Sequence, residues 1–201
     1  FFPAGTDPII GTMGAFAGFA VGYLARPLGG IIFGHIGDKH GRKKALVMTL
    51  AIMGVATFLM GLLPTFEQAG YLAPISLVIL RIAQGVASGG EWGGGVLMLS
   101  ENAPPDRVGF YAAWSQLGVS GGFVLSAAAF YLVQMLPQED FMSWGWRIPF
   151  LASILIFGVG LYIRRSLPES REFEESVKRR PKVEHPPALE VLRNHPKEVF
   201  Q

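Results

Sequence analysis

Four polar residues recur at helical spacing along an otherwise apolar stretch: Arg81, Gln84, Ser88 and Glu91. Their intervals of three, four and three residues place them within roughly 80° of one helix face. A charge near the bilayer centre costs at least about 2.5–3.5 kcal/mol, so such groups usually face a cavity or a partner. The stripe therefore predicts one wall of a water-filled path. The alternative is that Arg81 and Glu91 extend towards the two membrane surfaces.

Arg26 is a second charge within an apolar segment. It lies about 12 Å of helix before Gly34, which is too far for a loop residue. Pro27 follows it and should bend the helix, because proline cannot donate the usual backbone hydrogen bond. Arg26 could bind a carboxylate of a solute or one on another helix, or it could form an internal structural salt bridge. The residues leave these readings open.

A basic segment from 34 to 44 separates two apolar stretches. Residues 8–25 and 45–66 hold no Asp, Glu, Lys or Arg, and each is close to the roughly 20 residues that cross a bilayer as a helix. A loop over 37–44, at a membrane face, is therefore expected. The residues that define its pattern are Gly34, Asp38, Lys39, Gly41, Arg42 and Lys43.

Composition also indicates a membrane protein. Half of the 201 residues are hydrophobic and 16% are charged, whereas soluble domains carry about a quarter charged residues. The sequence pI near 9.0 could suggest nucleic-acid binding, but the basic residues lie beside apolar segments and are better explained as topology signals. No nucleic-acid partner is expected. The absence of cysteine excludes a disulfide within this sequence and leaves the redox compartment open.

The chain is predicted to be an all-α membrane protein with five spans, near 9–33, 45–63, 74–99, 109–136 and 146–163. Lys and Arg lie in 37–44, in 100–108 and from Arg164 onward, whereas 64–73 and 137–145 contain none. Because basic loops stay inside, 37–44 and the tail 165–201 are expected to be cytoplasmic. The bundle would occupy 1–164, and 165–201 would be a cytoplasmic linker.

Glycines recur every four residues on three of these spans: Gly14, Gly18 and Gly22, then Gly85, Gly89 and Gly93, and finally Gly118 and Gly122. Such spacing lets a neighbouring helix approach at backbone distance. The stripes are therefore expected to form packing surfaces.

The basic segment resembles the loop between helices two and three of major facilitator superfamily transporters, Gly-x-x-x-Asp-(Lys/Arg)-x-Gly-Arg-Lys. The resemblance implies that the five spans are helices two to six of a twelve-helix protein, within its N-terminal six-helix bundle. The first helix and the second half would be missing partners in the same protein. Arg81-x-x-Gln84-Gly85 is similar to a helix-four pattern in which the arginine is linked to proton coupling.

Glu101 and Arg107 flank two prolines and resemble the Glu-x-x-Pro…Arg loop of sugar-porter-like members. By that resemblance, Glu101 pairs with Arg42, and Asp38 lies at the N-terminus of a helix in the missing half. Contacts formed only when the cytoplasmic ends are closed would bias one access state. Together with the loop pattern, these residues form a predicted cytoplasmic gate.

Four segments look like the metabolite:proton symporter family: 1–3, 25–30, 89–94 and 144–150. This resemblance implies proton-coupled symport of a small metabolite, either an organic acid or an osmolyte such as proline or betaine. It implies an inner-membrane protein whose partners are the solute, protons and the lipid bilayer. The proton gradient supplies the energy and no cofactor is expected. A sugar-porter-like carrier is the closest alternative.

A polytopic membrane enzyme is the alternative from another class. Such enzymes usually gather histidines or carboxylates at the membrane face. His35, His40, His185 and His195 lack metal-ligand spacing with a carboxylate, and no nucleophile motif is present. Neither an enzyme nor a metal site is expected.

Overall fold

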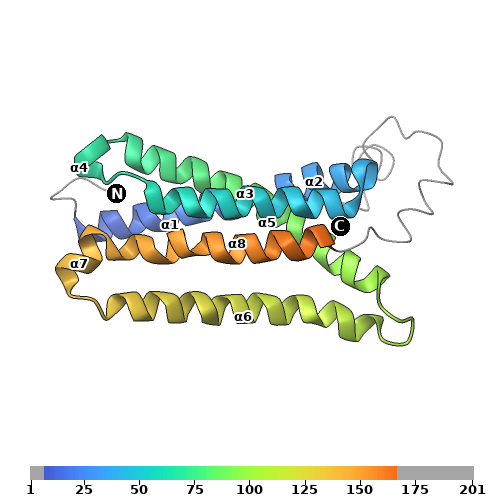
Figure 1. Ribbon diagram of the computed structural model, residues 1–201. Coiled ribbons are helices and arrows are strands. Elements are labelled where there is room, and N and C mark those ends of the chain that lie inside the picture. The colour runs from blue at the N-terminus through green and yellow to red at the C-terminus, as the bar shows by residue number, and fades with distance from the viewer. Residues whose placement is uncertain (1–6, 167–201) are drawn as a thin grey trace.

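The computed structural model describes residues 7–166 and contains only helices in that part of the chain (Figure 1). The elements are α1 (Pro8–Leu24), α2 (Arg26–His40), α3 (Arg42–Leu62), α4 (Phe66–Ala69), α5 (Leu72–Glu101), α6 (Val108–Gln134), α7 (Gln138–Ser143), the 3-10 helix η1 (Gly145–Arg147) and α8 (Ile148–Ser166). Five helical segments are long and apolar enough to cross a membrane, α1 and α2 together forming the first. The predicted all-α membrane fold with five spans is confirmed.

The loop expected over 37–44 is wrong in extent. Helix α2 continues to His40 and α3 begins at Arg42, so the chain reverses at Gly41 alone. Gly41 adopts a φ of 104°, which is accessible to glycine and strained for other residues. The charged motif residues therefore lie on the last turns of α2 and the first turn of α3. Most of the predicted linker 165–201 lies outside the described residues.

The first span is interrupted at Ala25, two residues before Pro27. Pro27 has no backbone N–H, so the helical hydrogen bond to Tyr23 cannot form. The Ala25 N–H still bonds to the Val21 carbonyl at 3.1 Å. The helix is thus interrupted next to Pro27, and Arg26 lies at the junction of α1 and α2.

Helix α5 is the centre of the bundle. It packs against α1, α2 and α3, and α3 packs in turn against α8. Helix α6 lies at the edge of the bundle beside α8 (Figure 1), and Val133 is its one buried residue. The polar stripe on α5 is therefore surrounded by helices from both ends of the described chain.

Glycines bring the backbones of the first span and α5 into close contact. A Cβ built at Gly85 would overlap the Gly22 carbonyl, and one at Gly89 would overlap the Arg26 carbonyl. One at Gly29 would overlap the Val86 carbonyl. The predicted packing surface is confirmed here. At Gly18, Gly93, Gly118 and Gly122 a Cβ would meet nothing within 4 Å among described atoms, so a packing surface at these glycines stays a prediction.

Replacing Gly89 with alanine should therefore destabilise a full-length protein, whereas Gly93→Ala on the same helix should have little effect. Overpacking against a backbone carbonyl costs about 1–3 kcal/mol, because the main chain must move to make room. Thermal unfolding of the purified proteins in detergent measures the difference. Equal melting temperatures for the two variants would contradict the close α2–α5 contact.

Candidate functional site

A chain of hydrogen bonds holds the start of the polar stripe. Arg81 Nη1 donates to Gln84 Oε1 at 3.2 Å, and Gln84 Nε2 donates to Thr57 Oγ1 on α3 at 2.6 Å. The Thr57 hydroxyl donates to the Met53 carbonyl at 2.7 Å. The Gln84 amide is thus held from both sides, and it accepts one hydrogen bond from the Arg81 guanidinium.

Arg26 and Arg81 meet at one cavity of about 200 Å³, which Gln84 and Ser88 also line. The Arg26 guanidinium lies 3.8 Å from the centre of the Tyr23 ring, which can stabilise the cation from one side. No Asp or Glu is among the described residues that line this cavity. Two cations therefore share a space that no described carboxylate neutralises.

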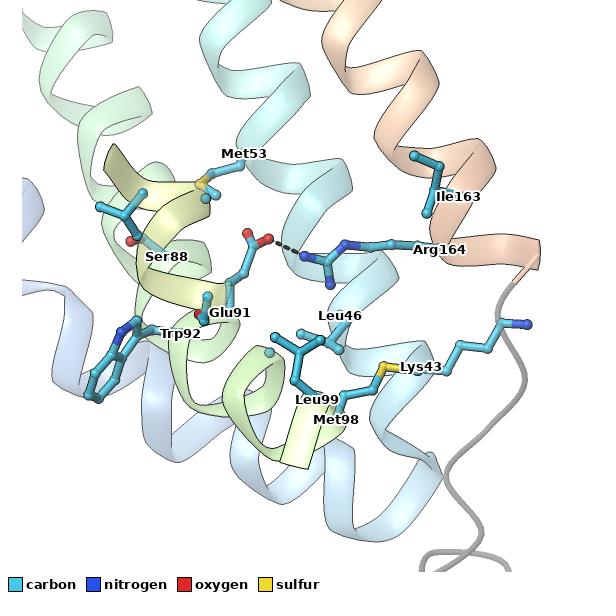
Figure 2. Close-up of a pocket in the computed structure, with 14 residues that line it drawn as sticks. Lys43, Leu46, Met53, Ser88, Glu91, Trp92, Met98, Leu99, Ile163 and Arg164 are labelled. Carbon is cyan, nitrogen blue, oxygen red and sulfur yellow. Dashed lines mark hydrogen bonds and ion pairs between the residues drawn. The ribbon is translucent and has the colours of Figure 1, made fainter. Parts of the chain in front are cut away.

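Glu91 belongs to a second, larger cavity of about 540 Å³, and Ser88 borders both. Figure 2 shows the Glu91 carboxylate pointing towards Arg164 of α8, and Arg164 Nη2 donates to Glu91 Oε1. The two side chains are 22% and 23% exposed, so each is largely removed from solvent. The predicted stripe thus lines two cavities, with the arginine in one and the carboxylate in the other.

Arg164 is a residue that the sequence did not assign to the site. It was grouped with the basic tail, but α8 continues to Ser166 and its last turn carries Arg164 back to the bundle. The available signal was Glu91 itself, because a carboxylate within a span usually faces a cavity or a cationic partner. The sequence does not specify which arginine fills that role, since the answer depends on how α5 and α8 cross.

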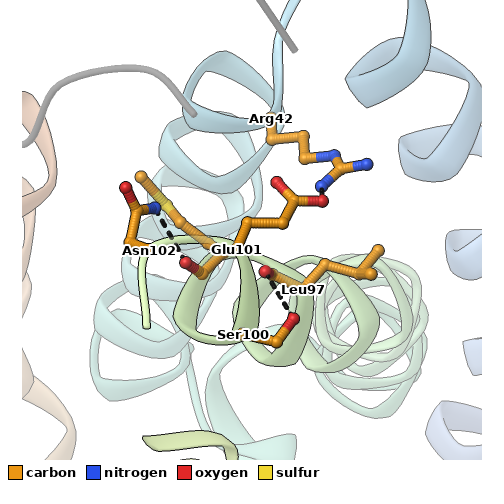
Figure 3. Close-up of polar contacts among 6 residues, drawn as sticks. Arg42, Leu97, Ser100, Glu101 and Asn102 are labelled. Atoms are coloured by element: carbon orange, nitrogen blue, oxygen red, sulfur yellow. Dashed lines mark hydrogen bonds and ion pairs between the residues drawn. The ribbon is translucent and has the colours of Figure 1, made fainter. Parts of the chain in front are cut away.

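The expected pairing of Glu101 with Arg42 is present (Figure 3). The Arg42 side chain is 22% exposed and that of Glu101 only 7%, so the contact is mostly buried. Asn102, the residue that follows α5, donates its side-chain N–H to the Met98 carbonyl at 2.9 Å. The pair joins the start of α3 to the end of α5.

Other predicted gate residues lie around this pair. Asp38 and Gly34 line a cavity of about 150 Å³ together with Arg42, and Lys39 is exposed on the last turn of α2. Lys43 Nζ donates to the Arg165 carbonyl at 2.7 Å, which ties α3 to the end of α8.

Arg107 does not join the cluster. Its side chain is 69% exposed and forms an ion pair at 3.5 Å with its neighbour Asp106. The resemblance predicted a gate residue, but the described structure places its guanidinium at the surface of the loop before α6. A side chain this exposed contributes little to holding α3 and α5 together.

Arg147 makes a further contact that the sequence did not predict. Its guanidinium donates to the Gly61 carbonyl at 3.1 Å and to the Leu63 carbonyl at 2.8 Å, at the end of α3. The final carbonyls of a helix lack helical partners, so an arginine that reaches them acts as a cap. This contact fixes the end of α3 to the start of α8.

Within residues 7–166 no three His, Cys, Asp or Glu side chains gather as a metal site would require. Five apolar spans, with Arg26 and the polar residues of α5 lining two cavities, define a polytopic helical membrane protein.

Residues 12–196 match the family of sugar (and other) transporters. The chain belongs to this family. It is 47% identical over 198 residues to the shikimate transporter of Escherichia coli (strain K12), covering 98% of this chain and 45% of that protein. It is 42% identical over 178 residues to the proline/betaine transporter of the same organism, covering 88% of this chain and 35% of that protein. The chain thus spans less than half the length of these relatives.

The fold is similar to that of a solved major facilitator superfamily protein, the proton:xylose symporter XylE bound to 6-bromo-6-deoxy-D-glucose. The TM-score is 0.71 at 20% identity, and the match covers 79% of this chain and 36% of that chain. The predicted superfamily is confirmed, and the family consists of transporters, not enzymes. The sugar-porter alternative is not better supported, because the shikimate and proline/betaine transporters are far more similar in sequence.

Proposed function

We propose that this chain is part of a secondary active transporter that couples proton entry to the uptake of a small metabolite by alternating access. The observation that carries the proposal is the cavity shared by Arg26 and Arg81, with Gln84 held by Thr57. The relatives named for shikimate and for proline/betaine support a small metabolite as the solute. Because the chain spans less than half the length of these relatives, helices outside this sequence are proposed to complete the path.

The solute proposed for this cavity carries a carboxylate. Two guanidinium groups beside a space without a described acid attract an anion, and guanidinium matches carboxylate geometry with paired hydrogen bonds. An organic acid fits this chemistry most simply. A zwitterionic osmolyte such as proline would use the same arginines for its carboxylate and would need an acceptor for its cationic end.

Proton coupling is proposed to pass through Arg81 without Arg81 carrying the proton. A guanidinium remains protonated in proteins, so it can only favour the charged form of a carboxylate nearby. Glu91 lies about 15 Å further along α5 and is paired with Arg164. The carboxylate controlled by Arg81 is therefore proposed to lie outside the described residues. The energy source is the proton gradient, without a bound cofactor.

The cluster at the α2–α3 end is proposed as the gate. An exposed ion pair contributes only about 0–1 kcal/mol, but Arg42 and Glu101 are mostly buried, where loss of one partner is far more costly. Asp38, beside the same cavity, is proposed to contact a helix of the missing half. These contacts would form when this end is closed and break when it opens.

The protein is proposed to lie in the inner membrane with the α2–α3 end and the tail 165–201 in the cytoplasm. The support is the Lys and Arg asymmetry, since the basic residues gather at this end and in the tail.

Arg81→Gln in a full-length protein should abolish gradient-driven accumulation of the solute while leaving some downhill exchange. The reason is that a neutral amide cannot favour the charged form of the coupling carboxylate. Accumulation and downhill exchange are both measured by the uptake of a panel of radiolabelled organic acids and osmolytes, with and without an imposed proton gradient. Arg81→Lys, which keeps the charge, should retain more accumulation. Normal accumulation by Arg81→Gln would leave Arg81 as a structural anchor only.

Asp38→Asn and Arg42→Ala should slow transport by more than about tenfold while changing solute affinity less than about threefold, because the gate lies far from both arginines of the binding cavity. Equilibrium binding and exchange rates, measured on the same purified variants, separate the two effects. A collapse of affinity with normal exchange would contradict the gating role.

A cysteine at His40 should resist an impermeant thiol reagent added outside intact cells and react once the membrane is permeabilised. His40 is exposed at the end of α2, so burial within the bundle would not protect it. A cysteine at Glu67, exposed in α4 at the other end, is the matched control and should react from outside. Rapid external labelling at position 40 would reverse the proposed orientation.

A further inference from the structure

The larger cavity contains a charged group that the proposed coupling route does not use. Glu91 reaches into it from α5, and its Oε1 atom accepts the hydrogen bond from Arg164. The second oxygen, Oε2, is buried and has no hydrogen-bond partner among the described residues. A buried carboxylate oxygen without a donor is costly, so a group that enters this cavity with a donor would be stabilised there.

The surroundings of Glu91 limit what that group can be. From α8 the cavity receives Arg164, and from α3 it receives Lys43, whose amine points away from Glu91 in Figure 2 and bonds to the Arg165 carbonyl. Helix α6 contributes Ser115 and Gly118 and no charge. Arg164 thus binds the Oε1 side of the Glu91 carboxylate, and the Oε2 atom can still accept a hydrogen bond from a donor in the cavity.

An ion pair removed from water gives little net stability, because the desolvation of both charges offsets their attraction. Glu91 and Arg164 are each more than three-quarters buried, yet a cavity of about 540 Å³ adjoins them. An ion pair that only holds helices together would be expected in a tightly packed core. The Glu91–Arg164 pair instead borders a cavity large enough for a small metabolite.

We infer that Glu91 and Arg164 form a second polar site of the transporter, which takes a hydroxyl or ammonium group of the solute. Glu91 Oε2 is the acceptor of that group's hydrogen bond, and Arg164 is a positioning residue that holds the carboxylate across the cavity. The inference rests on the proposed transport function, because the ligand is the transported solute. Ser88 borders both cavities, so it connects this site to the carboxylate site of Arg26 and Arg81.

The test uses small reagents that modify cysteine thiols as probes. Its outcome therefore does not depend on whether transport is detected. In a full-length protein without other cysteines, Ser115→Cys places a thiol on the α6 wall of the cavity. The rate at which this cysteine is modified is measured with three methanethiosulfonates, which carry an ammonium, a quaternary ammonium or a sulfonate. Each rate is divided by the rate at which the same reagent modifies a free thiol in solution, which removes the intrinsic reactivity of the reagent. Gly118→Cys is a second position, since a side chain there would meet no described atom within 4 Å.

The expected order is ammonium fastest, quaternary ammonium second and sulfonate slowest, because only the first reagent is both a cation and a donor. Glu91→Gln should reduce the preference for the cationic reagents by about three- to tenfold, and Arg164→Gln should increase it. Glu67→Gln makes the same charge change at the other end of the protein and should leave the ratios unchanged. The inference would be overturned by thiols that react at neither position, since another part of the protein would then fill the cavity. The inference would also be overturned if Glu91→Gln left the ratio of cationic to anionic modification rates unchanged.

Discussion

The close contact between the first span and α5 determines where the functional groups lie. Gly22 meets Gly85, and Gly89 meets the Arg26 carbonyl, at distances that exclude any side chain. Without a hydrophobic driving force inside the bilayer, helices associate through such packing at small residues. The contact brings Arg26 and Arg81 to the same cavity although they are far apart in sequence. If the two helices moved apart, neither arginine would have a defined position relative to the other.

Polar contacts attach α3, and through it the chain before α8, to this pair of helices. The Gln84–Thr57 hydrogen bond joins α5 to α3 in the middle of the bundle, and Arg42–Glu101 joins the same helices near one end. At the opposite end Arg147, the last residue of η1, caps α3. Two more contacts involve α8: Arg164 donates to Glu91 on α5, and Lys43 on α3 donates to the Arg165 carbonyl.

Much of this could be predicted from the sequence, because the bilayer imposes strong rules on composition and spacing. Long apolar stretches with few charges predicted the five spans, and the interval of four predicted that Gly85 and Gly89 lie on a packing surface, without naming the helix that packs there. The Arg42–Glu101 pair followed from resemblance and not from spacing. The partner of Glu91 could not be predicted, because the crossing of α5 and α8 depends on packing along both helices. The extent of the loop was also missed, since the charged turns of α2 and α3 remain helical up to Gly41.

The central claim is that this chain belongs to a proton-driven metabolite carrier, and uptake by reconstituted vesicles tests it most directly. A full-length protein containing these residues is placed in liposomes, a proton gradient is imposed, and internal concentrations of labelled shikimate, 2-oxoglutarate, proline and betaine are followed. The account predicts that at least one solute accumulates above its external concentration and that a protonophore abolishes the accumulation. Accumulation that persists with the protonophore, or that requires a sodium gradient instead, would contradict it.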